Sequence, residues 1–391
     1  MPSIPDSLLD KPATSANADV PPVDSSDDGA FRNDFGRSVV RLSGREWMAV
    51  ALVVVISVAW IPDLWERFGR MPITPDYRVP YAQSEDYWTY QRLLKQIVKA
   101  DRIPVIGDSF VWGEYVPASE SFSSALNAET ASDRFANVGL NGAHPLALAG
   151  FVRTYAGNLK NSRVILHCNL LWMSSPERDL QSDADVAFNH PRLVPQFFPR
   201  IVSYKAPLSQ RLAIVFDSHV RFFDLVNHVR TCYFDGRDLQ SWSIANPYAN
   251  PLRRLDQGLP GRSRESHHGA VAWTEQGIER QDLPWVDLES SLQWQAWREA
   301  ALRLQSQGNR VLAVIGPFNE HLLLKPSRAR YQAAKQKVEA WLRRQGIRYL
   351  APALLPSNLY GDASHPLSAG YARLARGIRQ DRVFQDWFAG K

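Results

Sequence analysis

The chain has 391 residues, 45% of them hydrophobic and 22% charged, which excludes a fibrous or wholly disordered protein and fits one large domain or two small ones. A net charge of +5 is small for this length, so nucleic acid is not expected as a partner. The two cysteines, Cys168 and Cys232, exclude a disulfide scaffold; they either form one bridge or remain free thiols. The sequence contains no dinucleotide fingerprint, phosphate loop or His-Glu-x-x-His motif, so neither a cofactor nor a metal is expected.

The N-terminal segment is not globular in composition. Residues 1–45 are rich in Pro, Ser, Asp and Ala, which predicts a disordered tail. Residues 47–61 carry no charge, and Leu64 and Trp65 extend this apolar character. The leader is too long and acidic for a signal peptide, and no small-x-small cleavage pattern follows the run. We therefore predict a single transmembrane anchor over residues 46–66.

The arginines that flank this segment indicate its orientation. Four lie between residues 32 and 45, and three lie between residues 67 and 78. Positive charge is enriched on the cytoplasmic side of membrane helices. This bias predicts a cytoplasmic tail, a single pass through the inner membrane, and a large domain on the periplasmic or extracellular side.

From about residue 82, short apolar runs alternate with segments of helical periodicity. The predicted strands are residues 102–106, 135–140, 163–168, 310–315 and 347–350. The predicted helices are residues 84–98, 145–159, 291–307, 327–345 and 367–378. This pattern predicts an α/β domain over residues 82–391, with a parallel sheet of about five strands covered by helices on both faces. Residues 175–290 are predicted to form an insertion or cap subdomain, with a helical stretch at 210–229 and a polar loop at 258–269.

Candidate catalytic side chains follow the carboxyl ends of these strands, where open parallel sheets bind ligands. Ser109 follows the first strand, Asn169 the third, and Asp362 and His365 the fifth. A serine hydroxyl needs a base to become a nucleophile, and His365 suits that role. Asp362, three residues earlier on the same loop, can hold the imidazole in the required tautomer. Taken singly, these residues also fit a helix cap, two turn residues and a strand cap.

The motifs GDS at 107–109, a glycine after the second strand, Asn169 and DASH at 362–365 resemble those of the SGNH (GDSL-type) hydrolase superfamily over residues 102–378. The family's third block usually reads Gly-x-Asn-Asp, and here residues 167–170 read HCNL, which keeps only the asparagine. The resemblance implies a catalytic triad of Ser109, Asp362 and His365. It also implies an oxyanion hole made by the N–H of Ser109, the N–H of Gly142 and the side chain of Asn169. Gly139 remains an alternative to Gly142.

Residues 107–122, GDSFVWGEYVPASESF, resemble the corresponding segment of membrane-anchored SGNH proteins of extracellular polysaccharide acylation. This resemblance implies an esterase or O-acyltransferase that acts on acylated envelope or exported polysaccharide, beside a multispanning membrane-bound O-acyltransferase. Two alternatives stay open: a lipolytic esterase for membrane-derived lipids, and a non-catalytic assembly subunit. Trp112 and Trp172 are candidates for lining a sugar-binding cleft. His144, His167 and the pair at 267–268 have no partners at metal-ligand spacing and are interpreted as structural or solvated.

Overall fold

The computed structural model describes residues 42–68, 74–186, 188–255 and 270–390. The predicted polar loop at 258–269 and the predicted tail up to residue 41 lie outside the described residues. Residues 54–391 form one compact unit, and residues 1–53 form the other. The larger unit contains the sheet, the insertion and the second half of the N-terminal helix.

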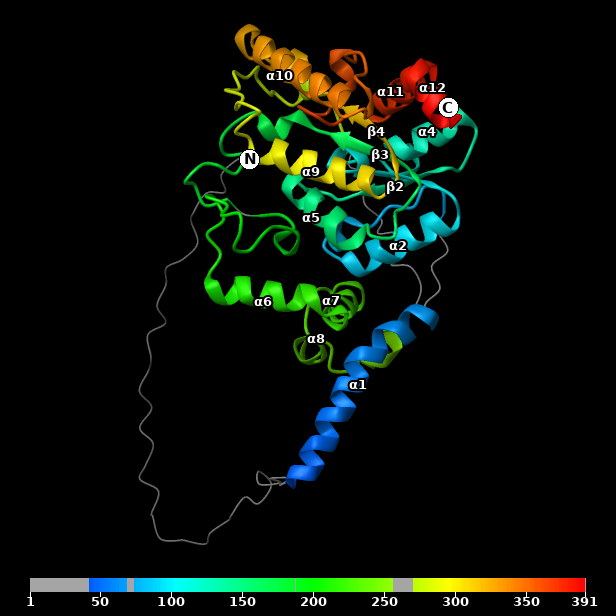
Figure 1. The fold of residues 1–391 in the computed structure, drawn as a ribbon, viewed down its shortest axis with the longest axis vertical. Helices are drawn as coiled ribbons and strands as arrows, with labels where there is room; N and C mark the ends of the chain where they lie inside the picture. Colours follow the sequence, from blue (N-terminus) through cyan, green and yellow to red (C-terminus); the bar gives the residue numbers. More distant parts are fainter. Residues whose placement is uncertain (1–41, 69–73, 187, 256–269, 391) are drawn as a thin grey trace, which may run out of the picture. The chain divides into compact units, whose positions relative to one another are not determined.

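The structure confirms an α/β fold with a five-stranded parallel sheet in the order β2-β1-β3-β4-β5 (Figure 1). The strands are β1 (Ile103–Gly107), β2 (Phe135–Gly139), β3 (Arg163–Cys168), β4 (Arg310–Ile315) and β5 (Arg348–Leu350). After β1 the chain forms β2 on one side, and it then crosses back to form β3 on the other side. This reversal is a topological switch point, where ligands of open α/β sheets bind beyond the carboxyl ends of the strands.

The strand side chains alternate between two cores, as the pleat of a strand requires. In β3, Val164 and Leu166 join the core that holds α2, α5, α9 and α10, whereas Ile165 joins the core on the opposite face with α4, α11 and α12. The helices of the first face are α2 (Tyr87–Lys99), α5 (Pro145–Tyr155), α9 (Leu292–Ser306) and α10 (Lys325–Arg344). Those of the second are α3 (Ser109–Trp112), α4 (Phe122–Thr130), α11 (Ser368–Gln380) and α12 (Arg382–Phe388). Both faces of the sheet are therefore covered, and the predicted set lacked α3, α4 and α12.

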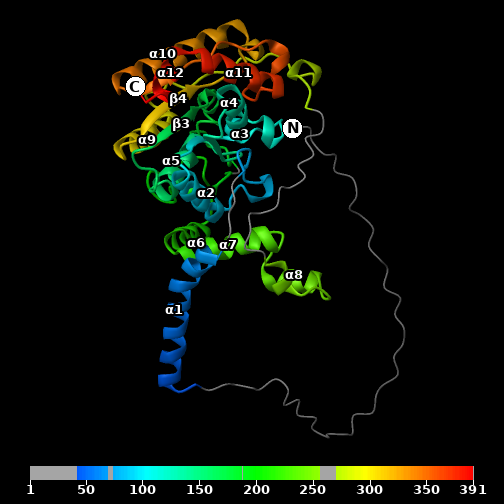
Figure 2. The same ribbon diagram turned by 90° about the vertical axis from the view of Figure 1, so that its right-hand side faces the viewer.

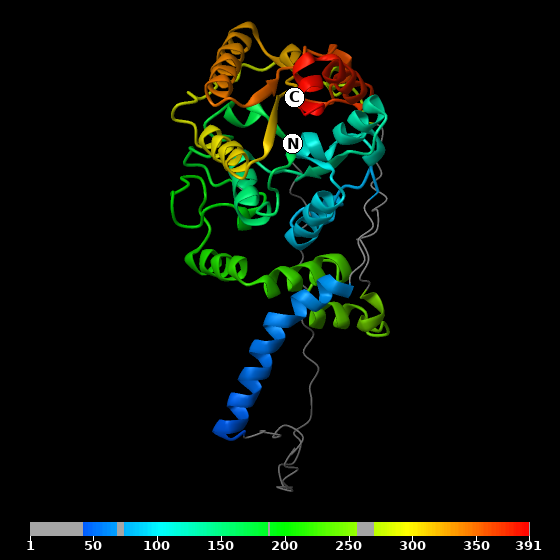
Figure 3. The ribbon, with the colours of Figure 1, turned by 45° about the vertical axis from the view of Figure 1, so that its right-hand side comes forward.

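In its described residues, the insertion between β3 and β4 carries three α-helices: α6 (Leu208–His219), α7 (Arg221–Tyr233) and α8 (Leu239–Ala245). The helical stretch predicted at 210–229 is thus two helices, because Val220 has an extended backbone and separates them. Figures 2 and 3 show α6, α7 and α8 beyond α2, on the side away from the sheet.

The predicted anchor is one continuous helix, α1 (Gly44–Phe68), two residues longer at each end than the segment 46–66. Its 25 residues extend about 37 Å at 1.5 Å per residue, against a hydrocarbon layer of about 30 Å. The mean hydropathy of its most apolar 18-residue stretch is 2.1, and only 6% of that stretch is buried. By length and composition, α1 is able to cross a membrane.

Candidate active site

Ser109 is positioned by β1 and by the short helix that follows it. α3 begins at Ser109, and Asp108 caps it by accepting a hydrogen bond from the N–H of Phe110 at 3.1 Å. Asp108 and Phe110 are buried, whereas Ser109 is half-buried. The hydroxyl therefore stands on a fixed turn at the carboxyl edge of the sheet and remains accessible.

Asp362 and His365 lie on a tight loop between β5 and α11. The N–H of Gly361 donates to the carbonyl of His365 at 2.8 Å and closes this loop. Inside it, Asp362 Oδ1 accepts hydrogen bonds from the N–H groups of Ser364 and His365 at 2.8 and 2.9 Å. The Asp-x-x-His spacing thus forms a local turn that leaves the other carboxylate oxygen for the imidazole.

The three predicted catalytic side chains form one hydrogen-bonded chain. His365 Nε2 lies 2.7 Å from Ser109 Oγ, and His365 Nδ1 lies 2.7 Å from Asp362 Oδ2. The Tyr115 hydroxyl also donates to Asp362 Oδ2, at 3.1 Å, and the Tyr115 ring meets the His365 ring edge-on. In this arrangement an imidazole can take the serine proton while the carboxylate holds its other nitrogen.

Burial and the neighbouring carboxylate act in opposite directions on the pKa of His365. Burial lowers this pKa, whereas the charge and hydrogen bond of Asp362 raise it, and the net result is a pKa of about 9. For Asp362, burial raises the pKa and His365 lowers it, to about 2. At neutral pH the resting pair is therefore an imidazolium and a carboxylate, and the free base form of His365 increases as the pH rises towards 9.

The two glycines after Val138 have different surroundings. Gly139 is inside β2: its N–H donates to Asn137 Oδ1 at 2.9 Å, and a β-carbon there would lie 2.1 Å from the backbone nitrogen of Trp112. Gly142 has a φ of +75° and lines the cavity in front of Ser109. The surroundings of Gly142 therefore fit an oxyanion donor, and those of Gly139 fit close packing against α3.

Asn169 lies against the buried carboxylate of Asp108. Its Nδ2 donates to Asp108 Oδ2 at 2.8 Å, and its Oδ1 accepts from the N–H of Leu171 at 3.0 Å. Asp108 also interacts with His167 Nδ1 and Trp172 Nε1, each at 3.1 Å. Burial raises the pKa of Asp108, but these partners hold it well below its ordinary value. One of the two amide protons of Asn169 is therefore donated to Asp108, which leaves one for an oxyanion. The oxyanion role of Asn169 stays a prediction.

Asn141 is a candidate that the sequence analysis missed. Its Nδ2 is buried without a hydrogen-bond partner among the described residues, and the residue lines the same cavity as Ser109 and His365. An unpartnered amide donor at this place is suited to stabilise a developing oxyanion. The only signal in the sequence is its position before Gly142, and an Asn-Gly pair after a strand ordinarily indicates a turn.

The insertion supports the loop that carries Asn141. His190 Nε2 lies 2.7 Å from the carbonyl of Asn141, and His190 Nδ1 lies 2.8 Å from the hydroxyl of Tyr87. Because burial lowers the pKa of His190, the ring is neutral, so Nε2 donates to the carbonyl and Nδ1 accepts from Tyr87. The N–H of His190 donates to Glu85 Oε1 at 3.2 Å. His190 thus ties the loop after β2 to α2 and the residues before it.

A cavity of about 600 Å³ opens in front of Ser109 and His365. Most of its lining is polar, and three of the lining residues, Asn227, Arg230 and Thr231, belong to α7 of the insertion. Within the described residues, neither predicted tryptophan lines it. Trp112 is buried with the guanidinium of Arg78 stacked 3.9 Å from its ring, and Trp172 donates to Asp108.

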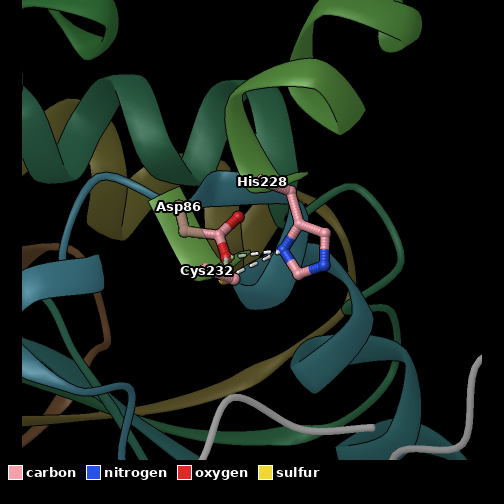
Figure 4. A group of neighbouring side chains, drawn as sticks. All are labelled: Asp86, His228 and Cys232. Carbon is pink, nitrogen blue, oxygen red and sulfur yellow. Dashed lines mark hydrogen bonds and ion pairs between the residues drawn. The ribbon is translucent and has the colours of Figure 1, made fainter. Parts of the chain in front are cut away.

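One group of described residues has the composition of a metal site. Asp86, His228 and Cys232 place a ligand atom each within 4.8 Å of one another. Figure 4 shows these three side chains side by side. Asp86 Oδ2 already accepts from Thr89 Oγ1 at 2.6 Å and lies 2.7 Å from His228 Nδ1 and 3.1 Å from Cys232 Sγ. Because these groups converge on one oxygen rather than on a common centre, we interpret the cluster as a buried joint between α2 and α7.

The remaining predicted side chains have structural surroundings. Both cysteines are free, Cys168 buried in β3 and Cys232 half-buried in α7. His144 caps α5 by accepting from the N–H of Ala147 at 3.3 Å. His167 lies between Asp108 and the carbonyl of Gly316. The histidine pair at 267–268 lies outside the described residues.

Comparison with protein-family models gives no match for this chain, and comparison with curated proteins gives none either.

Proposed function

We propose that this protein is a serine-dependent acyl-ester enzyme of the SGNH type, an esterase or O-acyltransferase, that acts on an acylated envelope or exported glycan. The observation that carries this proposal is the chain from Ser109 Oγ through His365 to Asp362, with both contacts of His365 at 2.7 Å. Helix capping or turn formation would not require this alignment of three side chains from two distant segments.

The proposed chemistry has two steps. In the first, His365 Nε2 takes the proton of Ser109 Oγ as this oxygen attacks the ester carbonyl, and the proton then passes to the departing alcohol oxygen. The carbonyl oxygen gains negative charge, which the N–H groups of Ser109 and Gly142 and a side-chain amide of Asn169 or Asn141 would stabilise. In the second, water or a sugar hydroxyl attacks the acyl-serine, and His365 again accepts and returns the proton.

The lining of the cavity supports a glycan rather than a long acyl chain as the bound group. Side chains such as Asn189, Asn227 and Arg230 offer hydrogen-bond partners suited to sugar hydroxyls. A site for a lipid acyl chain would need a largely apolar wall. A lipolytic esterase and a non-catalytic assembly subunit are the alternatives that the experiment below must also address.

The location of the enzyme is part of the proposal. We infer that α1 anchors the protein in the inner membrane, with the catalytic domain on the periplasmic or extracellular side. An anchored transferase needs a source of acyl groups, and a multispanning membrane-bound O-acyltransferase would supply them. The apolar length of α1 supports the anchor, and the arginine bias in the sequence supports the orientation.

The test is turnover of p-nitrophenyl acetate by the purified full-length protein and its Ser109→Ala variant. We expect the substitution to lower kcat at least about 10³-fold, because the nucleophile is removed and little packing is lost. Ser306→Ala, an exposed serine on α9, is the matched control and should leave turnover unchanged. Equal turnover by Ser109→Ala would refute the triad, and an inactive wild-type protein of native stability would favour the assembly subunit. Faster turnover of long-chain lipid esters than of acetylated oligosaccharides would favour the lipolytic enzyme.

A further inference from the structure

The insertion exposes an unusual share of the apolar side chains on this molecule. Outside α1, eighteen described large hydrophobic residues are exposed, and eleven of them lie between residues 197 and 252. The most exposed of these are Tyr248, Phe198, Ile244 and Leu252, all above 70%. A soluble surface ordinarily scatters such residues singly, so their concentration in one segment marks an interaction surface.

Helix α6 shows the pattern most clearly. Leu208, Leu212 and Phe216 follow one another at four-residue intervals, and each is more than half exposed. Four-residue spacing places side chains on one face of a helix. No residue of α6 is buried, so the apolar face of this helix points away from the core of its own domain.

The same segment contacts the second half of α1. Arg221, the first residue of α7, forms ion pairs with Asp63 at 2.6 Å and Glu66 at 2.9 Å. Trp65 packs against Tyr233 and His228, with ring centroids 6.3 and 6.5 Å apart. These contacts lie within one compact unit, residues 54–391, so they fix the junction of α6 and α7 against the second half of α1.

Beside these contacts, a hollow between α1 and the junction of α6 and α7 extends to an uncharged part of α1. Val54, Val58 and Pro62 share a hollow of about 410 Å³ with His219–Phe222, which joins α6 to α7. Residues 47–65 of α1 extend about 28 Å, nearly the full thickness of the hydrocarbon layer. If they cross that layer, its outer boundary lies near Trp65, and Val54 lies about 16 Å below it. The junction of α6 and α7, which faces this stretch across the hollow and is paired with Asp63 and Glu66, would then lie beside the outer part of the membrane-crossing segment.

The charge of the insertion fits a membrane surface as well. Residues 191–255 contain nine Arg and Lys against four Asp and Glu, a net +5 equal to that of the whole chain. Arg200, Lys205 and Arg237 are among its exposed residues. Basic side chains beside an apolar face attract anionic lipid headgroups.

We propose that helices α6–α8 are a membrane-seated platform, with the apolar face of α6 and the junction with α7 inserted into the lipid headgroup and outer acyl layer. The lipid bilayer is the occupant, because α1 brings this face to the membrane and a basic segment surrounds it. This inference rests on the proposed anchoring of the chain by α1. It places the mouth of the cavity, which Asn227 and Arg230 of α7 help to line, close to the membrane surface.

A buried contact joins the platform to the catalytic domain at this point. The buried cluster of Asp86, His228 and Cys232 joins α7 to the start of α2 (Figure 4). Seating α6 and α7 in the bilayer would therefore fix the height of Ser109 above it. Substrates would then be ester groups presented within a short distance of the membrane, such as those on a glycan emerging there.

The experiment measures depth in a bilayer. The full-length protein carries one introduced cysteine, at Leu208→Cys or Phe216→Cys, labelled with bimane and reconstituted into phosphatidylcholine vesicles with one-quarter phosphatidylglycerol. Doxyl-labelled lipids should quench both reporters by at least about half. Gln336→Cys, exposed on α10, is the matched control and should keep its fluorescence. The unsubstituted protein, treated with the same dye, corrects for labelling of the native cysteines.

A reporter in α1, at Val50→Cys, separates the two proposals. Quenching of Val50→Cys together with Leu208→Cys and Phe216→Cys supports both the anchor and the platform. Quenching of Val50→Cys alone, with α6 no more quenched than Gln336→Cys, overturns the platform and leaves the anchor intact; a protein partner would then be the occupant of α6. Absence of quenching at Val50→Cys overturns the anchor itself. Adding Leu212→Glu to the Leu208→Cys protein should reduce its quenching, and an unchanged value would contradict insertion of this face.

Discussion

The carboxyl end of the sheet and the insertion differ in which side chains they bury and which they expose. At the sheet end, the strands are buried on both faces, and the polar side chains of Ser109, His365 and Asp362 are aligned to within hydrogen-bond distance. In α6, no residue is buried, and leucine and phenylalanine side chains point outward. The sheet end holds three polar side chains in one hydrogen-bonded arrangement, whereas α6 leaves apolar surface uncovered. Under the proposals above, the first region carries the chemistry and the second sets the position at the membrane.

The largest expected effect is that of Asp362→Asn, which tests whether the sheet end carries the proposed chemistry. The amide keeps the shape of the side chain but removes the charge that holds Nδ1 of His365 and stabilises the imidazolium. We expect kcat for p-nitrophenyl acetate to fall about 10³-fold, with the melting temperature changed little. Kinetics and a thermal scan of the same preparation measure both quantities. A loss below about tenfold would show that Asp362 does not orient the base.

The side-chain donor of the oxyanion hole gives the next largest effect. Asn141→Ala should lower kcat about 10²-fold with little change in KM, because its unpartnered Nδ2 would act mainly on the charge of the transition state. Asn169→Ala is the comparison variant: it also removes a donor from buried Asp108, so it should lower the melting temperature as well as the rate. A silent Asn141→Ala beside an inactive, well-folded Asn169→Ala would assign the donor to Asn169.

Most of the strands and candidate catalytic residues at the carboxyl end of the sheet could be predicted from the sequence. Apolar runs such as RVILHC at 163–168 predicted strands because burial on both faces leaves little room for polar residues. Ser109, Asp362 and His365 could be predicted from their positions directly after strands, from the three-residue spacing of Asp362 and His365, and from the family resemblance of these motifs. Asn141 could not, since it became a candidate only when the fold left its Nδ2 without a partner among the described residues and placed it beside Ser109 and His365 in one cavity.

The insertion was less accessible to sequence analysis for a physical reason. Val220 interrupts a periodicity that otherwise continues from α6 into α7, so one helix was predicted in place of two. Nothing in the sequence links Cys232 to Asp86, and only the fold brings its Sγ to 3.1 Å from Asp86 Oδ2. The apolar face of α6 resembles a core face in the sequence, and only its exposure shows that nothing in the described chain covers it.

The pH dependence of turnover tests whether Asp362 raises the pKa of His365. His365 acts as a base only when neutral, and its folded pKa is raised to about 9, so activity should increase with pH across this range. From pH 7 to pH 8, kcat/KM should rise about tenfold, and it should level off only above pH 9. Circular dichroism at each pH excludes unfolding as the cause. A rising limb centred near 6.5 would show that Asp362 does not raise the pKa of the base.

The buried joint tests whether the insertion is rigidly attached. Asp86→Asn weakens three interactions in a buried place and should lower the free energy of unfolding by about 1–3 kcal/mol. Hydrogen exchange in α7 should accelerate, and labelling of Ser109 by a fluorophosphonate should persist. Asp287→Asn, which loses an exposed pair with Lys337 at 2.8 Å, is the matched control and should leave exchange in α7 unchanged. Equal effects of the two variants would mean that Asp86 does not hold α7.

The smallest expected effect concerns the fate of the acyl-serine. Hydrolysis and transfer share Ser109 and the same oxyanion donors, so they differ only in whether water or a sugar hydroxyl attacks. Polar groups of α7 line the cavity and would hold a sugar acceptor, whereas water needs no such support. We therefore expect slow release of acetate from small esters, and a decrease of about twofold in that release when an oligosaccharide acceptor captures the acetyl group. Mass spectrometry of the acceptor and a parallel acetate assay measure the partition, with Ser109→Ala as the blank. Efficient removal of acetyl groups from a pre-acetylated glycan, without any acetylated acceptor, would identify a de-acylating esterase and would leave α7 a role in binding the substrate glycan only.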